Sequence, residues 1–368
     1  MNVIDIHEQP QDASDAAPTA LRGLNLDRLT ALLTTAGFPP FRARQLYHWI
    51  FARAAESFDE MTNLPKPLLA WLRENTLLSD MELVRAQGPE DGTRKVLFRL
   101  RDGRYVESVL MRDEGAGRTS FCLSSQVGCA MGCEFCLTGF GGFLRNMSTS
   151  EIIGQALLMR RHLLAEGEML HHIVFMGMGE PMLNLDHVIP AVRLISDPDG
   201  FAHSRRRITI STSGVIPGMD RLGAENLGIG LAVSLNATTD AIRTGIMPVN
   251  KKWPLAELLA AMRRFPMEQR RRITIEYVLL TGINDTPEDA RRLVHLLRGV
   301  RCKVNLIMFN QSPHLHFKQV DENVLDAFAQ ILSESHYTVT VRWSKGRDVE
   351  AACGQLAAHY FEDAKTHA

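Results

Sequence analysis

Short runs of apolar, β-branched residues that alternate with helical stretches limit most strongly how this chain can fold. Runs this apolar, separated by segments of helical periodicity, are typical of parallel strands that helices bury. The runs cover residues 172–176, 208–210, 231–235, 273–278, 304–307 and 339–341. About six or seven strand–helix units fit the pattern, which predicts an α/β fold built as a full or partial barrel. Such barrels carry their functional residues at the C-terminal ends of the strands.

The segments outside the expected barrel divide the rest of the chain. Residues 1–20 are polar and rich in Pro, Ala and Asp, which predicts a disordered tail. Residues 21–85 are expected to form a small helical domain, because apolar residues recur there at helical spacing between prolines. Residues 86–118 are expected to form a β-hairpin extension around the turn signal Asp102-Gly103. The barrel then spans residues 119–345, with its first strand at 120–126, and residues 346–368 form a C-terminal segment.

The composition excludes several classes of protein. The formal net charge of the 368 residues is −1, so a nucleic-acid partner would have to be held by local basic patches. No apolar run reaches the roughly 18 residues of a membrane span, and the N-terminus is polar, so neither export nor membrane insertion is expected. Six cysteines, three of them in one short segment, are too few for a secreted disulfide scaffold and indicate a reducing cytoplasm.

Three cysteines recur at short spacing in one glycine-containing loop, as Cys129, Cys133 and Cys136. Three thiolates can hold three irons of a cubane 4Fe-4S cluster, so that the fourth iron keeps an open position for a substrate. The alternative is a structural zinc site, which needs four ligands, and Cys122 could be the fourth. The spacing favours the cluster, because no second pair of cysteines follows.

Polar residues follow several of the expected strands directly. Glycines permit close backbone approach in the string at 176–181, and the carboxylate within it is a natural partner for an ammonium group. Hydroxyl and amide groups after other runs are suited to a ribose, an adenine and a carboxylate. The candidates for cofactor binding are Gly179, Glu180, Ser211, Ser234, Leu235, Asn236 and Asn310. Each of them alone is more often a strand cap or a turn residue.

Four longer strings resemble a known family. The Cys-x3-Cys-x2-Cys spacing resembles the radical S-adenosylmethionine (SAM) superfamily, and the strings at 124–129, 177–181, 248–252 and 348–356 closely resemble its dual-specificity RNA adenine-C2 methyltransferases. The resemblance runs from about Leu21 to the C-terminus. It implies a partial (β/α) barrel with a small N-terminal helical domain. It also implies a 4Fe-4S cluster that chelates SAM at its open iron and cleaves it with one electron to a 5′-deoxyadenosyl radical.

The resemblance further implies an unusual use of two other cysteines. Cys353 would take a methyl group from one SAM, and the radical from a second SAM would remove hydrogen from that methyl group, so that its carbon adds to the base. Cys122 matches the position that releases the adduct by forming a disulfide, and Glu107 matches the proton acceptor. Without the resemblance, both cysteines would be interpreted as packing residues and Glu107 as an ordinary outward-facing glutamate. Cys302 matches no such role and is predicted to be a packing residue.

The implied substrates are an adenosine of large-subunit ribosomal RNA and the adenosine 3′ to the anticodon of some transfer RNAs. The target base would have to leave its stack to reach a barrel mouth. A one-electron donor such as flavodoxin or ferredoxin is a further expected partner, in the cytoplasm and without a membrane. Basic runs that could hold phosphates lie at 205–207, 251–252, 270–272 and 342–347.

Two rival functions remain open from the sequence. The sister family that methylates carbon 8 of the same ribosomal adenosine shares the cysteine chemistry, and a map of the methylated carbon separates the two. The N-terminal segment and residues 305–307 favour the carbon-2 family. The rival from another class is a zinc-stabilised RNA-binding protein without catalysis, which would contain zinc and no iron.

Overall fold

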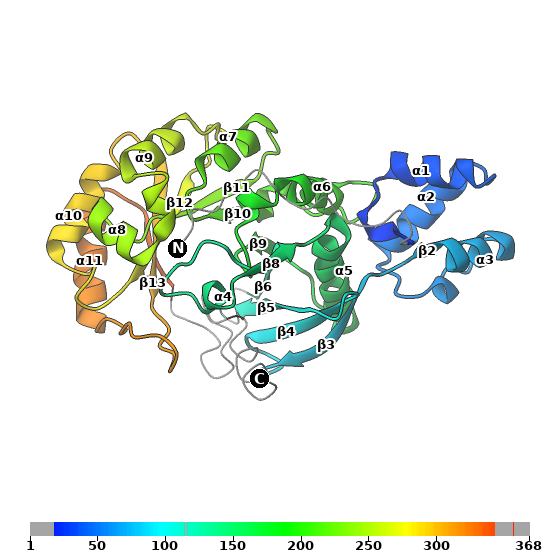
Figure 1. The fold of residues 1–368 in the computed structure, drawn as a ribbon, viewed down its shortest axis with the longest axis horizontal. Coiled ribbons are helices and arrows are strands. Elements are labelled where there is room, and N and C mark those ends of the chain that lie inside the picture. The colour runs from blue at the N-terminus through cyan, green and yellow to red at the C-terminus, as the bar shows by residue number, and fades with distance from the viewer. Residues whose placement is uncertain (1–17, 114, 116, 343–355, 357–368) are drawn as a thin grey trace.

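A ten-stranded sheet with helices along its outer side organises the protein (Figure 1). The computed structural model describes residues 18–113, 115, 117–342 and 356. Most of the expected N-terminal tail and the string that contains Cys353 lie outside these residues. The described residues comprise an N-terminal helical segment followed by the α/β sheet domain.

Seven neighbouring strands of the sheet run parallel, in the order β6-β9-β10-β11-β12-β13-β14. They are β6 (Arg118–Cys122), β9 (His172–Phe175), β10 (Ile208–Thr212), β11 (Gly230–Ser234), β12 (Ile273–Leu279), β13 (Cys302–Met308) and β14 (Val339–Arg342). All six apolar runs that the sequence analysis singled out are strands of this series. The predicted parallel α/β fold is therefore confirmed.

Helices connect successive parallel strands and pack on the outer side of the sheet (Figure 1). They are α5 (Thr149–Ala165), α6 (Leu185–Ser196), α7 (Ile216–Ala224), α8 (Asp240–Ile246), α9 (Leu255–Arg264), α10 (Pro287–Leu296) and α11 (Glu322–Glu334). Two of them begin with capping boxes, formed by Ser148 with Glu151 and by Thr286 with Asp289. In each box the hydroxyl accepts from the third backbone N–H of the helix, which removes an unsatisfied donor.

The two faces of the parallel strands differ in polarity. In β10, Ile208 and Ile210 are fully buried against the helices, whereas Thr209 and Ser211 alternate with them on the inner face. Successive side chains of a strand point to opposite faces, so this alternation divides an apolar outer face from a polar inner one. Side chains on the outer face form the hydrophobic core, and polar side chains on the inner face are available for binding and catalysis.

An antiparallel extension keeps the barrel partial. β4 (Arg94–Leu100) and β5 (Tyr105–Asp113) form the hairpin expected around Asp102-Gly103, and β5 pairs antiparallel with β6. That pairing occupies the edge of β6 that barrel closure would need. A third strand, β3 (Met81–Gln87), was not expected; it pairs with β4 through a bulge between Leu83 and Arg85. Its pattern is too irregular to be recognised from alternation alone.

The first barrel strand is shorter than the expected 120–126. β6 ends at Cys122, although Leu123 still donates to the Val174 carbonyl at 2.8 Å, and beyond it the Gln155 side chain of α5 binds the backbone of Ser124. The Ser124 N–H donates to Gln155 Oε1 at 3.0 Å, and Gln155 Nε2 donates to the Ser124 carbonyl at 2.9 Å. A separate short strand, β7 (Gln126–Gly128), follows.

The N-terminal segment is helical and docks against the outside of the sheet domain. It contains α1 (Leu26–Thr35), α2 (Phe41–Tyr47) and α3 (Lys66–Asn75), and β1 (Thr19–Ala20) pairs with β2 (Thr76–Leu77) across its base. The Tyr47 hydroxyl donates to Asp197 at 2.7 Å, next to the end of α6. Arg161 of α5 pairs with Glu60 at 2.6 Å. Polar side-chain contacts therefore fix the segment to α5 and α6.

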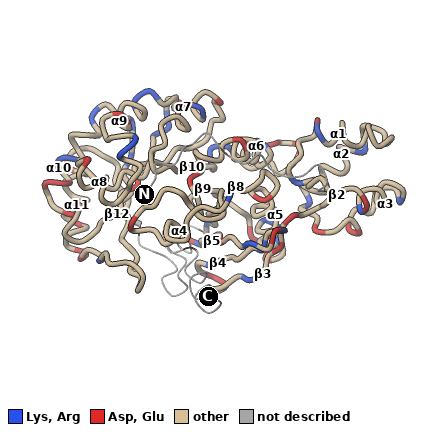
Figure 2. The backbone as a smooth tube through the Cα atoms, in the orientation of Figure 1, with Lys and Arg blue, Asp and Glu red and all other residues tan. Residues whose placement is uncertain are grey.

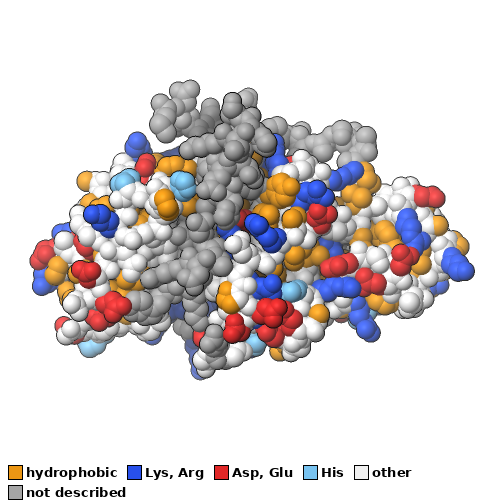
Figure 3. Space-filling model, turned by 90° about the horizontal axis from the view of Figure 1, so that it is seen from below, with side chains coloured by type: hydrophobic (Ala, Val, Ile, Leu, Met, Phe, Trp, Pro, Cys, Tyr) orange, Lys and Arg blue, Asp and Glu red, His pale blue; other side chains and the backbone are white. Residues whose placement is uncertain are grey.

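Charged side chains are spread over the surface. Figure 2 shows Lys and Arg interspersed with Asp and Glu along the chain. The face drawn in Figure 3 likewise mixes acidic, basic and apolar groups at both ends. Within the described residues, none of the helices is both long enough and apolar enough to cross a membrane.

Removal of the α10 cap should lower stability without touching the inner face of the sheet. We expect Thr286→Ala to cost about 1 kcal/mol, because the helix loses the hydroxyl that accepts from Asp289 N at 3.1 Å. The measurement is the midpoint of denaturant unfolding. Thr35→Ala, at an exposed position in the last turn of α1, is the matched control and should leave the midpoint unchanged. Equal losses in both variants would contradict the cap.

Candidate active site

A glycine-containing loop carries the three clustered cysteines across the C-terminal ends of the strands. β7 and β8 (Phe143–Asn146) pair antiparallel and bracket this loop, and α4 (Leu137–Phe140) follows Cys136 directly. The Cys129 N–H donates to the Gly142 carbonyl at 2.8 Å. At Gly128 φ is +78°, and a Cβ there would lie 2.0 Å from the Gly142 oxygen. Only glycine fits where the loop leaves β7.

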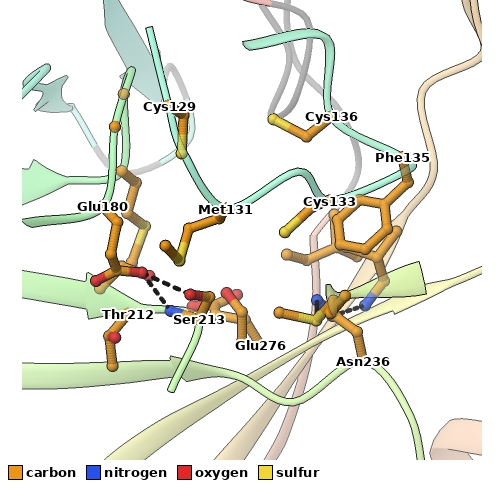
Figure 4. A pocket seen from close by; sticks show the side chains of 18 of the residues that line it. Cys129, Met131, Cys133, Phe135, Cys136, Glu180, Thr212, Ser213, Asn236 and Glu276 are labelled. Carbon is orange, nitrogen blue, oxygen red and sulfur yellow. Dashed lines mark hydrogen bonds between the residues drawn. The ribbon is translucent and has the colours of Figure 1, made fainter. Parts of the chain in front are cut away.

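The three thiols line one wall of a cavity of about 180 Å³ (Figure 4). Burial raises the pKa of Cys129 to about 12 and raises that of Cys133 well above its ordinary value. Both thiols are therefore protonated in the metal-free protein, and metal binding must displace those protons. Three thiols along one wall of a hollow match the three protein ligands that a cubane cluster with one open iron needs.

Glu180 lies across the cavity from the cysteines, as Figure 4 shows. Its Oε2 accepts from the backbone N–H and the hydroxyl of Ser213, both at 2.7 Å, and its Oε1 accepts from Met182 N at 3.1 Å. The side chain is buried, and that burial raises the pKa of Glu180, although the hydrogen bonds from Ser213 and Met182 oppose the shift. The carboxylate is thus fixed in direction and open to a cationic ligand.

Gly179 allows this placement. Its φ is +98°, and a Cβ would lie 2.5 Å from the Gln126 Cβ and 2.9 Å from the Gln126 backbone nitrogen. Gln126 in turn accepts from Glu180 N through Oε1 at 2.8 Å. The glycine therefore lets the chain pass close to β7 while it turns the carboxylate into the cavity.

The structure brings most of the other expected cofactor-binding residues to the same cavity. The residues of that set that line it are Gly179, Glu180, Ser211, Ser234, Asn236 and Asn310. Leu235 does not line it: its side chain is fully buried, and its backbone N–H donates to the Glu276 carbonyl at 3.0 Å. Asn236 adopts a positive φ of 56° and accepts from Val278 N at 2.9 Å, which ties the ends of β11 and β12 together.

Thr212 and Ser213, which follow Ser211 in the expected hydroxyl-bearing string, also line the cavity, whereas Glu276 is a cavity residue that the sequence did not reveal. Glu276 is buried on the inner face of β12, and its Oε2 accepts from Asn305 Nδ2 at 2.6 Å. It is the one charged residue within the apolar strand β12, and that pattern was a signal that could have identified it.

Glu107 and Cys122 lie beside the cavity, outside the residues that line it. Cys122 pairs in register with Val109 of β5, so Glu107, two residues before Val109, is its diagonal neighbour on the same face. Glu107 is buried, and its Oε1 lies 3.3 Å from Lys95 Nζ. The alternative interpretation of Glu107 as an outward-facing surface residue therefore does not apply, because β5 is covered on both faces.

The remaining cysteines and basic runs fall elsewhere. Cys353 lies outside the described residues. Cys302 begins β13, where burial raises its pKa to about 12, as expected of a packing residue. The runs 205–207 and 270–272 lie at the N-terminal ends of β10 and β12, opposite the cysteines. Lys251 and Lys252 are exposed next to Pro248, whose ring faces Gly132 of the cysteine loop.

Comparison with known proteins identifies the family. Residues 19–78 match the ribosomal RNA large subunit methyltransferase N-terminal domain, and residues 123–297 match the radical SAM superfamily. The dual-specificity RNA methyltransferase RlmN of Geobacter sulfurreducens is 49% identical over 336 residues, which cover 91% of each chain. The chain belongs to the RlmN family. The RlmN protein of Anaeromyxobacter dehalogenans is also 49% identical, over 92% of this chain and 91% of its own.

The solved structures agree with membership of the RlmN family. A radical SAM methyltransferase from Sphaerobacter thermophilus superposes with a TM-score of 0.89 and 43% identity, over 93% of this chain and all of that one. The chain is thus a radical SAM methyltransferase that uses a 4Fe-4S cluster and SAM. The partial barrel and the recognised family are confirmed.

Gly179→Ala should destroy the cofactor site through a backbone clash. We expect SAM affinity to fall at least about tenfold, since an alanine here incurs both the roughly 1–2 kcal/mol cost of a positive φ and contact with Gln126. Equilibrium binding of SAM to the reconstituted protein measures this. Gly282→Ala is the matched control, because Gly282 has φ +72° and open space around it. Equal losses of SAM binding in both variants would contradict the clash.

Proposed function

We propose that this chain methylates carbon 2 of adenosine in large-subunit ribosomal RNA and in some transfer RNAs, with a cluster held by Cys129, Cys133 and Cys136. The observation that carries the proposal is the cavity itself, in which three thiols face a fixed carboxylate and a set of hydroxyl and amide groups. Relatives named as dual-specificity RNA methyltransferases support the substrate class. Both domain matches lie within one continuous chain.

Different residues of the cavity bind different chemical groups of SAM. When bound, the cluster supplies the single electron that cleaves SAM to a 5′-deoxyadenosyl radical. Glu180, held by Ser213, binds the ammonium group of SAM by a charge-assisted hydrogen bond. Ser211, Ser234 and the amides that follow β11 and β13 bind its ribose and carboxylate.

Three further residues carry out the methyl transfer in this proposal. Cys353 carries the methyl group to the base, Glu107 accepts the proton that the adduct loses, and Cys122 releases the product by disulfide formation with Cys353. Leu356, three residues after Cys353 in the sequence, contacts the end of the cysteine loop, because its carbonyl accepts from the Thr138 hydroxyl at 3.3 Å.

RNA is held by the N-terminal segment and by basic residues at the cavity mouth. Lys251 and Lys252 are the best placed of the basic runs, because they are exposed beside the cysteine loop. In α2, Arg42 stacks on the exposed ring of Phe41 at 4.5 Å, an arrangement that can also receive a base. The target adenosine enters the cavity flipped out of its stack. The electron comes from a cytoplasmic donor such as flavodoxin or ferredoxin.

Glu180→Gln should weaken SAM binding and should abolish the loss of SAM affinity that the wild type shows at acidic pH. Because the pKa of Glu180 is raised, the carboxylate takes up a proton at a higher pH than an ordinary glutamate, so wild-type affinity should fall as the pH is lowered through that range. The variant has no carboxylate to titrate, so its affinity should be about tenfold lower near neutrality and flat with pH. Glu257→Gln, exposed on α9, should match the wild type. A wild-type profile that stays flat on acidification would contradict the role of Glu180.

Methylation itself is tested after anaerobic reconstitution with iron and sulfide. With SAM, a reductant and unmodified ribosomal RNA, the wild type should form 2-methyladenosine, whereas Cys353→Ala and Cys122→Ala should not complete turnover. Cys302→Ala, a buried cysteine outside the cavity, is the matched control and should retain activity. Mass spectrometry locates the methylated carbon. Detection of 8-methyladenosine would show that the chain has the carbon-8 activity of the sister family instead. A protein that binds zinc and no iron would refute catalysis by a cluster.

A further inference from the structure

Arg243 is a fully buried arginine at the cysteine side of the barrel that no proposed step uses. It lies on α8, and none of its surface is exposed. Its Nε donates to the Leu235 carbonyl at 3.0 Å and its Nη1 donates to Asn250 Oδ1 at 3.1 Å. Its Nη2 donates to the carbonyls of Ser213 at 2.6 Å and Ser234 at 3.2 Å. One guanidinium therefore joins the ends of β10 and β11 to the string at 248–252.

The charge of Arg243 is not neutralised by a contacting carboxylate in the described chain. All four acceptors are neutral oxygens. Burial lowers the pKa of Arg243 to about 10, while Cys133 and Asp240 oppose that shift, so the guanidinium stays protonated at neutral pH. Asp240, on the same helix, is engaged instead by Asn250 Nδ2 and Leu255 N, both at 2.9 Å. A positive charge without a carboxylate in direct contact thus sits in a water-excluded region.

The same helix holds the cysteine loop. Glu134, between the second and third cysteines, donates its N–H at 3.0 Å to the carbonyl of Ile246, three residues after Arg243. Ser213 and Ser234, whose carbonyls accept from Arg243, line the same cavity as Cys133. The guanidinium of Arg243 therefore lies directly behind the wall of the cavity that holds the thiols.

We propose that Arg243 is an electrostatic positioning residue for the cluster, whose buried positive charge raises the reduction potential at Cys133. The inference depends on coordination by the three cysteines proposed above. Reduction of the bound cluster by one electron from a low-potential donor would change its core from the 2+ to the 1+ state and so add one negative charge beside the loop. Arg243 would exchange neither an electron nor a proton. A fixed cation in a low-dielectric site stabilises that added charge.

Two substitutions separate the charge of Arg243 from its hydrogen bonds. Arg243→Gln removes the charge and keeps an amide donor for the strand-end carbonyls, whereas Arg243→Lys keeps the charge and loses the forked geometry. The midpoint potential of each reconstituted protein is measured without SAM, by redox titration followed through the electron paramagnetic resonance signal of the reduced cluster. Arg264→Gln, at an exposed position on α9, is the matched control.

The expected result is ordered by charge. In Arg243→Gln the equilibrium constant for reduction should fall about tenfold, which is about 59 mV more negative for a one-electron couple. Arg243→Lys and Arg264→Gln should stay within about twofold of the wild type, which is well under that shift. Equal potentials in all four proteins would overturn the inference, as would loss of the cluster from both Arg243 variants, which would make Arg243 a purely structural residue. A wild type that binds no cluster would instead overturn the proposed function.

Discussion

The pairing of β5 with β6 is the constraint on which the rest of the molecule depends. It occupies the edge that would close the barrel, so the sheet ends at β3 on one side and at β14 on the other. It also carries Glu107, which belongs to no barrel strand, onto the inner face next to Cys122. A closed barrel of the same strands would have no position for that carboxylate. The open form therefore follows from the same hydrogen bonds that place Glu107 beside Cys122.

The inner face is polar, and its stability comes from polar groups that satisfy one another. Glu276 accepts from Asn305, whose own Oδ1 accepts from Thr340, so one chain of hydrogen bonds crosses β12, β13 and β14. Buried polar groups cost free energy unless they are paired in this way, and a paired network also fixes side-chain direction. The apolar outer face supplies the hydrophobic stabilisation that this inner face lacks.

The sequence predicted the parallel strands and the cysteine loop because both are encoded locally, in apolar runs and in spacing. It did not reveal the burial of Glu107, because strand alternation says that a residue faces one side and not what covers that side. The contacts of Arg243 could not be predicted for a related reason. Three of its acceptors are the backbone carbonyls of residues 213, 234 and 235, and no sequence pattern identifies such acceptors. The early end of β6 was missed because Gln155, which binds the backbone of Ser124 just beyond it, lies 31 residues away from Ser124 in the sequence.

Helix α5 joins two distant parts of the protein. Its Arg161 holds the N-terminal helices, its Gln155 holds the chain just after β6, and its Glu151 pairs with Arg145 of β8 at 2.8 Å. With 17 residues it is about 25 Å long, and it is unbroken between these anchor points. Because one helix makes all three contacts, a shift of α5 along its axis would displace the N-terminal segment and the strands that bracket the cysteine loop together.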